Sequence, residues 1–125
     1  MSQETFSRIR LHEKAYRFLD SKGHVYIILP YRRKNDKEIV EVVLYKKSRA
    51  RDRMLAECIY VEKYVHTGPA SHHKLEKIFP ETGCRSLKDL INTYHVRYRN
   101  SEKYDTPNIY YIYKLKVLYK RYPTL

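Results

Sequence analysis

The sequence predicts a small α+β domain, a mixed β-barrel or sheet with short helices in the order α-β-β-β-α-α-β. Its 125 residues are the usual size of one domain, so residues 1–125 are expected to form a single unit. Hydrophobic residues make up 42% of the chain, which is enough for a modest core. Stretches with helical spacing of apolar residues are interspersed with alternating or continuous apolar stretches, which are typical of strands.

The first predicted elements are a helix and three strands. Apolar residues at i, i+4, i+7 and i+8 from Leu11 predict an amphipathic helix over about 12–20. Gly23 is expected to end it, because glycine readily adopts the left-handed conformation of a helix C-cap. Runs of β-branched and aromatic residues predict strands over 25–29, 38–45 and 54–65.

Two short helices and a long strand are predicted for the second half. Apolar spacing predicts a helix over about 75–79 that ends before Pro80. Ser86 is expected to cap the next helix, with Asp89 three residues later completing an imperfect capping box. Alternation in the last strand is expected to place on one face Ile109, Tyr111, Tyr113, Leu115, Val117 and Tyr119.

Several classes of protein are disfavoured by what the sequence lacks. The longest apolar runs, 25–29 and 109–113, have five residues, whereas a membrane span needs roughly 17–25. The first ten residues lack the apolar core of a secretion signal. The two cysteines have no zinc-type spacing. We therefore expect a cytoplasmic protein with no membrane association, no metal site and no cofactor.

The charge indicates a polyanionic partner. Lys and Arg number 26 against 14 Asp and Glu, which gives a net charge of +12. Cations concentrated in loops are better phosphate contacts than cations spread evenly, although a basic surface can also be merely solvated. The sequence therefore predicts nucleic-acid binding, to RNA rather than DNA. Two loop-like stretches supply the expected phosphate contacts: Arg32, Arg33 and Lys34, and then Lys46, Lys47, Arg49, Arg51 and Arg53.

Tyrosine dominates the aromatic residues, with 14 Tyr, three Phe and no Trp. A tyrosine ring can stack on a base while its hydroxyl stays hydrated, but tyrosine also fills half-buried strand positions. We expect a base to enter a cleft beside strand 25–29, near Lys22, His24 and Tyr26.

Several strings resemble the ASCH domains of the PUA-like superfamily, over nearly the whole chain. They are residues 9–19, 42–45, 55–61, 86–90 with Tyr94, and 110–115. The resemblance implies a PUA-like fold that opens with a strand and a helix, and a role connected with RNA. Some ASCH proteins deacylate a modified cytidine or cleave RNA, and an essential lysine lies in their Gly-x-Lys-x-x-x-x-Arg motif.

The chain departs from that motif. If Ser21 takes the place of its glycine, then Gly23 and Ile28 take the places of its two cations. If Gly23 does, then Val25 and Pro30 take those places. Lys22 lies one position away, so the resemblance implies binding more than catalysis.

Side chains for catalysis are sparse. Lys22 and His24 are weak catalytic candidates. His72 and His73, near His66, form the densest histidine set, but adjacent residues at a helix start point about 100° apart, which favours surface capping over a shared ligand. Alternative functions are an RNA-processing enzyme (a ribonuclease or a modified-nucleoside hydrolase using Lys22 or a histidine) and a small interaction factor, such as a viral protein, that binds an acidic protein.

Overall fold

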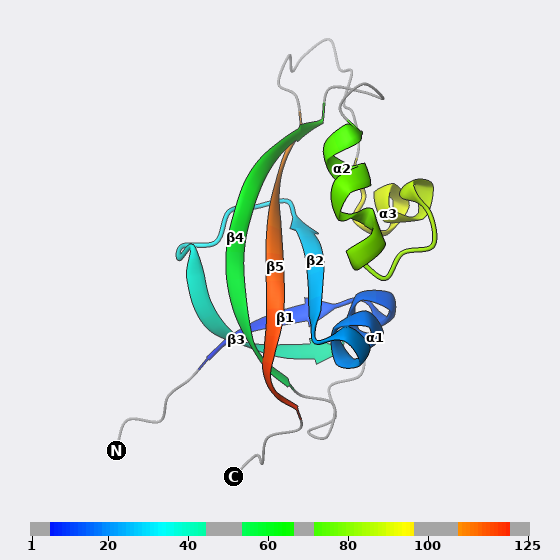
Figure 1. The fold of residues 1–125 in the computed structure, drawn as a ribbon. Helices are drawn as coiled ribbons and strands as arrows, with labels where there is room; N and C mark the ends of the chain where they lie inside the picture. The colour runs from blue at the N-terminus through cyan, green and yellow to red at the C-terminus, as the bar shows by residue number, and fades with distance from the viewer. Residues whose placement is uncertain (1–5, 45–53, 67–71, 97–107, 121–125) are drawn as a thin grey trace, which may run out of the picture.

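The computed structural model describes residues 6–44, 54–66, 72–96 and 108–120, which form one five-stranded sheet and three short helices (Figure 1). The strands are β1 (Ser7–Leu11), β2 (His24–Leu29), β3 (Lys37–Leu44), β4 (Met54–His66) and β5 (Asn108–Lys120). The helices are α1 (Glu13–Lys22), α2 (His73–Ile78) and α3 (Leu87–Thr93), with a 3₁₀ turn, η3 (Phe79–Glu81), after α2. The predicted α+β class is confirmed.

The sheet has the order β1-β3-β4-β5-β2. β1 runs parallel to β3, and every other neighbouring pair is antiparallel. The two edge strands are therefore β1 and β2, which α1 joins in sequence. Figure 1 shows the long strands β4 and β5 curving together through the middle of the molecule.

The first strand is absent from the order predicted by spacing. Ile9 and Leu11 are buried, whereas Arg8, which precedes Ile9, and Arg10, which lies between the two, are exposed. This alternation is typical of a half-buried strand. Leu11 therefore belongs to β1 and not to the helix, which begins at Glu13.

The predicted end of α1 is confirmed. Gly23 has a φ of 84°, and its N–H donates to the carbonyl of Leu19 at 2.8 Å. This left-handed cap turns the chain directly into β2. Ala15 and Leu19 are the buried residues of the helix and pack into the core beneath it.

Two cores lie on opposite faces of the sheet. The first packs α1 against all five strands, and the second packs α2 and α3 against β2, β4 and β5. Adjacent residues of β2 show the division, because Ile27 is buried in the first core and Ile28 in the second.

An extra residue in β4 lets one strand serve both cores. Tyr60 is opposite Tyr113, but the next paired residue, Glu62, is opposite Ile112, so Val61 is the extra residue of a β-bulge. Before the bulge, even-numbered residues such as Cys58 enter the first core. Beyond it, Tyr64 enters the second.

The face of β5 that the alternation predicts is buried in the middle of the strand but not at its ends. Ile109 is 39% exposed and Tyr119 is 66% exposed, whereas Tyr110 and Ile112 are buried on the opposite face. At the start of β5, α2 and α3 cover the other face, so the buried side changes along the strand. At its end, Tyr119 lies beyond a register shift, because Ala56 pairs with Val117 and Leu55 with Tyr119.

The caps of α3 follow the sequence prediction. The hydroxyl of Ser86 accepts from the N–H of Asp89 at 3.0 Å. Asp89 in turn accepts from the N–H of Arg85 at 2.9 Å and from the ammonium of Lys14 on α1 at 2.6 Å. None of the helices that the structure describes is long and apolar enough to cross a membrane.

Candidate functional site

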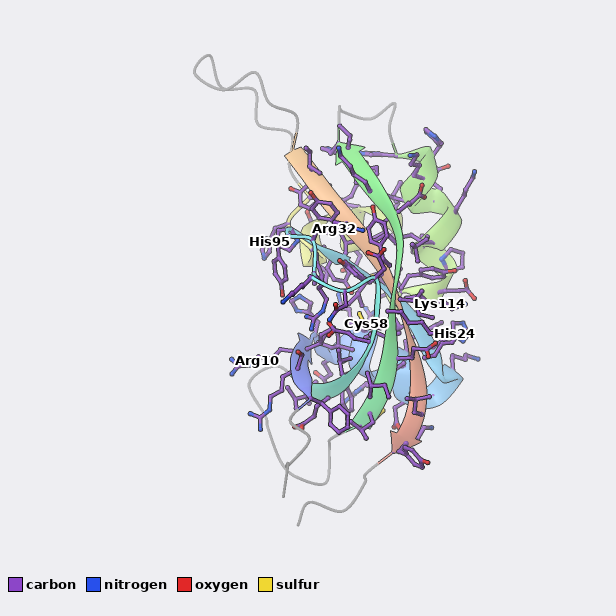
Figure 2. All side chains as sticks on the ribbon, turned by 90° about the vertical axis from the view of Figure 1, so that its left-hand side faces the viewer. Arg10, His24, Arg32, Cys58, His95 and Lys114 are labelled. Atoms are coloured by element: carbon purple, nitrogen blue, oxygen red, sulfur yellow. The ribbon has the colours of Figure 1, made fainter. Side chains whose placement is uncertain are left out.

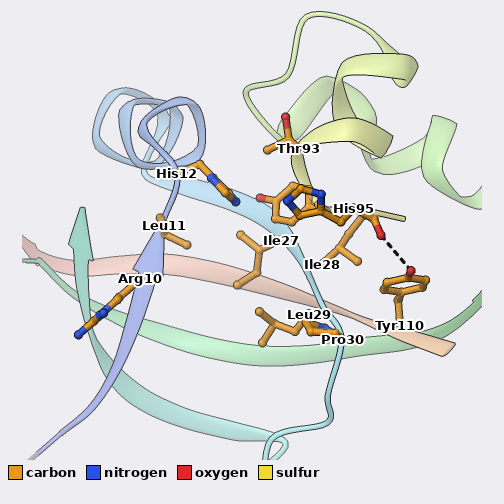
Figure 3. Close-up of a pocket in the computed structure, with 11 residues that line it drawn as sticks. Arg10, Leu11, His12, Ile27, Ile28, Leu29, Pro30, Thr93, His95 and Tyr110 are labelled. Atoms are coloured by element: carbon orange, nitrogen blue, oxygen red, sulfur yellow. Dashed lines mark hydrogen bonds between the residues drawn. The ribbon is translucent and has the colours of Figure 1, made fainter. Parts of the chain in front are cut away.

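A cavity of about 390 Å³ lies between the two edge strands (Figure 3). The end of β1, the second half of β2 and the residues that end α3 form its walls, and Tyr110 of β5 also borders it. Its lining residues are Arg10, Leu11, His12, Ile27, Ile28, Leu29, Pro30, Thr93, Tyr94, His95 and Tyr110.

One part of the lining is apolar. Leu11, Ile27 and Ile28 are buried, and Leu29 is half-buried. They are held in place by the two cores on either side of β2, so this part of the cavity is rigid. A flat apolar ligand placed here would lose contact with water on one face.

The other part of the lining is polar and aromatic. The rings of His12 and Tyr94 meet edge to face, with centroids 5.7 Å apart. His95 follows Tyr94 directly in the chain, and Figure 3 shows the His12 ring directed from the start of α1 toward the side where His95 lies. Arg10 is exposed at the rim, with its side chain extending away from the cavity (Figure 3).

His95 has a left-handed backbone, with a φ of 52°. Such a conformation is uncommon outside glycine and is maintained by surrounding contacts. The N–H of Val96 donates to the carbonyl of Ile91 at 3.0 Å, and the hydroxyl of Tyr110 donates to the carbonyl of His95 at 3.1 Å. Both bonds fix His95 in the cavity wall.

The hydroxyl of Tyr94 is buried and has no hydrogen-bond partner among the residues that the structure describes. Burial, and then the nearby Cys84 thiol, raise the pKa of Tyr94 well above its usual range. The hydroxyl therefore stays protonated, able to donate a hydrogen bond.

Burial lowers the pKa of His12, with smaller contributions from His95 and Lys14. The direction is that expected for an imidazole that is partly desolvated beside other cationic or cation-forming groups. His12 is therefore a neutral proton acceptor over a wider pH range than a free histidine.

Lys22, His24 and Tyr26 do not line this cavity. Lys22 is exposed in the last turn of α1, and Nε2 of His24 is 2.9 Å from a carboxylate oxygen of Glu81. The ammonium of Lys114 lies over the ring of Tyr26, 5.4 Å from its centroid. Figure 2 places His24 and Lys114 on one side of the molecule, with Arg10 and His95 on the other.

Two of the predicted phosphate contacts are engaged in ion pairs. Arg32 binds Asp36 at 2.5 Å and lies over the Tyr60 ring, 4.5 Å from its centroid. Arg33 binds Glu38 at 2.8 Å and is nearly buried. A phosphate would compete with these carboxylates for both guanidinium groups.

The remaining predicted phosphate contacts are Lys34 and a larger cluster of five cations. Lys34 is exposed and forms no ion pair within the described residues. The larger predicted cluster lies outside the described residues: Lys46, Lys47, Arg49, Arg51 and Arg53.

The predicted surface capping by His72 is wrong. His72 occupies the N-cap of α2 but makes no side-chain capping bond. Its ring instead stacks on His66, with centroids 5.4 Å apart. His66 is buried, and its Nδ1 is 2.9 Å from the hydroxyl of Tyr64. These histidines belong to the packing of β4 and α2 rather than to the cavity.

The thiols are poor nucleophiles. Cys58 is buried within the sheet, as Figure 2 shows, and burial raises its pKa to about 11. Burial also raises the pKa of the half-buried Cys84. Across the described ranges no three His, Cys, Asp or Glu side chains gather as they would around a metal ion.

Sequence reasoning did not assemble the residues of this cavity. His12 and His95 are far apart in the chain, and no spacing rule pairs them. Arg10 lies in the string 9–19 that resembles the opening of ASCH domains, and the sequence assigns it no role of its own. The signal available was the neighbouring Tyr94 and His95 after a capped helix, which marks a polar and aromatic helix end.

No protein-family model matches the chain, and no curated protein or solved structure is significantly similar to it.

Proposed function

We propose that the protein binds single-stranded nucleic acid, RNA rather than DNA, with one base in the cavity between β1 and β2. The observation that carries this proposal is the cavity itself, with an apolar floor on one side and imidazole and phenol groups on the other. Its volume of about 390 Å³ lies near the lower end of the range for small-ligand pockets, about 300–1,000 Å³, and suits one nucleotide rather than a larger ligand.

The lining matches what an unstacked base needs. Leu11 and Ile27 offer an apolar surface for one face of the base. Tyr94 and His95 offer rings for stacking, an interaction worth about 1–3 kcal/mol per base. Thr93 and His12 offer hydrogen-bonding groups for its edge. A base inside a duplex could not enter, so unpaired RNA is the preferred ligand.

The edge strands add main-chain groups to the site. In the described sheet, β1 pairs only with β3, and β2 pairs only with β5. Each therefore has a second edge with N–H and C=O groups that no other described strand occupies. Since the cavity lies between these strands, those groups are available to a base or to a ribose 2′-hydroxyl.

Charge supports a polyanionic ligand at this place. Leu11, at the cavity end of β1, is opposite Leu44, and Met54 is opposite Val42. The basic segment 45–53 therefore begins beside the end of β1 that lines the cavity, while the cavity-lining half of β2 lies toward the other end of the sheet. Arg10 at the rim adds a cation that forms no ion pair with a described residue. We assign the flanking phosphates to Arg10 and to this segment.

The resemblance to ASCH domains is consistent with this function, and a PUA-like barrel is part of the proposal. The opening strand and helix, β1 and α1, match the start that the resemblance implies. The family's lysine motif is not retained, so the contacts in this cavity must come from the chain's own residues.

Two neighbouring substitutions test the site. Thr93→Trp fills the cavity, whereas Asn92→Trp adds the same ring one residue earlier, at an exposed position that does not line it. Fluorescence polarisation measures the Kd for single-stranded RNA, duplex RNA and single-stranded DNA. We expect single-stranded RNA to bind best, Thr93→Trp to weaken it about tenfold or more, and Asn92→Trp to change it less than about twofold.

The same experiment separates the alternatives. Equal weakening by both tryptophan variants, or by neither, would place the RNA site elsewhere. If no nucleic acid binds at low salt, the basic charge is a solvated surface or serves an acidic protein partner, and the proposal fails.

A further inference from the structure

We propose that His12 and His95 cleave the RNA that the cavity binds, His12 accepting the proton of a ribose 2′-hydroxyl and His95 protonating the leaving 5′-oxygen. This inference rests on the RNA binding proposed above. It adds a reaction, a substrate class and two catalytic roles to that site.

The reaction needs only these two proton transfers. The 2′-oxygen attacks phosphorus as its proton passes to a ring nitrogen of His12, and the bond from phosphorus to the 5′-oxygen breaks as His95 gives that oxygen a proton. The products are a 2′,3′-cyclic phosphate and a 5′-hydroxyl. Atoms and charge balance without water, an oxidant or a further reactant, and the histidines return to their starting states by exchange with solvent.

The two imidazoles reach one cavity from different elements. His12 lies where β1 passes into α1, and His95 lies just after α3. Both line the cavity, with the Tyr94 ring 5.7 Å from the ring of His12. An acid and a base that approach from separate walls can serve the attacking and leaving oxygens of one phosphate.

His95 is held in an unusual conformation. Its left-handed backbone is unfavourable for a residue with a side chain. The bonds from Tyr110 to His95 and from Val96 to Ile91 maintain it. Strain of this kind concentrates where a side chain must point in one direction for function.

The charges around His12 favour its role as the base. It lies near Lys14 on α1 and near Tyr94 and His95 at the end of α3, while the side chain of Arg10 on β1 is directed away from the cavity (Figure 3). Burial first, and then His95 and Lys14, lower the pKa of His12, so it is neutral and able to accept a proton near neutral pH.

The other described histidines have different surroundings. His24 is paired with Glu81, 2.9 Å away. His66 is buried against Tyr64 and stacked on His72. His73 is exposed on α2 and does not line the cavity, which makes it a matched control.

The test uses end-labelled single-stranded RNA with repurified protein and excess chelator, at several pH values. Asparagine replaces each histidine, because it caps helices, tolerates a left-handed backbone and cannot exchange protons as imidazole does. We expect a 2′,3′-cyclic phosphate by mass spectrometry and a bell-shaped pH profile. At saturating protein, where a weaker Kd from the lost base contact no longer limits the rate, His12→Asn and His95→Asn should each slow cleavage about 100-fold or more. His73→Asn should cleave as the wild type does.

The outcomes separate this inference from the proposed function. RNA that binds and stays intact at every pH overturns the cleavage and leaves the binding. Cleavage that both cavity variants retain shows that other residues or a contaminant cause it, and also overturns the assignment. Absence of binding overturns both proposals. RNA with 2′-O-methyl groups should bind without being cut, and its cleavage would contradict attack by the 2′-oxygen.

Discussion

The hydroxyl of Tyr110 on β5 donates a hydrogen bond to the main-chain carbonyl of His95, 3.1 Å away. The bond connects the central part of the sheet to the left-handed residue in the cavity wall. The site is therefore built on the fold itself, because the conformation of His95 depends on a strand in the second core.

Removing the Tyr110 hydroxyl should loosen His95. We expect Tyr110→Phe to weaken RNA binding several-fold and to lower the free energy of unfolding by about 1 kcal/mol, the usual net value of one hydrogen bond. Polarisation and urea unfolding measure the two effects. Tyr111→Phe is the matched control, since no hydrogen bond of its hydroxyl is found among the described residues. Equal behaviour of the two variants would show that the bond does not position His95.

Two glycines with left-handed backbones should respond differently to alanine. A Cβ at Gly83 would lie 2.5 Å from the carbonyl oxygen of Lys14 and 3.0 Å from Cβ of Phe18, whereas a Cβ at Gly23 would contact nothing within 4 Å. Both variants have the cost of the left-handed conformation, but only Gly83→Ala also forces α1 to move. We expect it to be less stable than Gly23→Ala by about 1–3 kcal/mol in urea unfolding. Similar stabilities would mean that α1 is not packed against this turn.

Acid should weaken the ion pair between Lys14 of α1 and Asp89 of α3. The hydrogen bond from Lys14, and then that from the N–H of Arg85, lower the pKa of Asp89 below its ordinary value of 3.8. A carboxylate whose pKa is lower in the folded state stabilises the fold above its unfolded pKa, and this contribution is lost as the pH falls through the lower folded value. The loss therefore begins below about pH 4.

Thermal unfolding between pH 5 and pH 2 tests the contribution of the Lys14–Asp89 ion pair. Asp89→Asn has no carboxylate to titrate, so its Tm should fall less than that of the wild type between pH 5 and pH 2. Lys14→Met, which removes the main cause of the lowered pKa, should reduce the fall in the same way. A wild-type acid dependence retained in both variants would contradict the account.

The basic segment between β3 and β4 should dominate the salt dependence of RNA binding. The triple variant Arg49→Ala, Arg51→Ala and Arg53→Ala should reduce the slope of log Kd against log salt by up to about three units. A control with the same loss of charge replaces the exposed cations Lys77, Arg85 and Lys88 of the helical region. Its slope should stay close to that of the wild type. Equal slopes in the two triple variants would mean that net charge, and not this segment, drives binding.

Local signals in the sequence predicted much of the fold. Gly23 ends α1 and Ser86 caps α3, as predicted. Both could be predicted because a helix cap depends on only a few neighbouring residues. The strands β2, β3 and β4 were found within one residue at each end, from apolar and β-branched runs.

What escaped prediction depends on contacts between distant residues. Leu11 fits both a helical spacing and a strand, and only its pairing with Leu44 decides between them. The bulge at Val61 has no local signal but reverses the buried face of β4. Likewise, the cavity forms only when His12 and the end of α3 come together, so the sequence indicated a charged, aromatic protein without locating the site.

The pairing of Arg32 with Asp36 could have been anticipated from their spacing. The two side chains are four residues apart, and Arg33 has Glu38 five residues on. Such nearby carboxylates reduce the charge that a basic cluster offers to phosphate. A count of cations in a loop is therefore a weaker guide to binding than a count that subtracts adjacent acids.

The proposed RNA site places one base of a single strand in the cavity between β1 and β2. The most direct measurement is a titration of ¹⁵N-labelled protein with a short single-stranded oligoribonucleotide, followed by amide chemical shifts. If a base binds there, the largest shifts should fall on residues 10–12, 27–29 and 93–96, the segments that line or adjoin the cavity. Shifts confined to α2 and the outer face of β4, with these three segments unchanged, would contradict it.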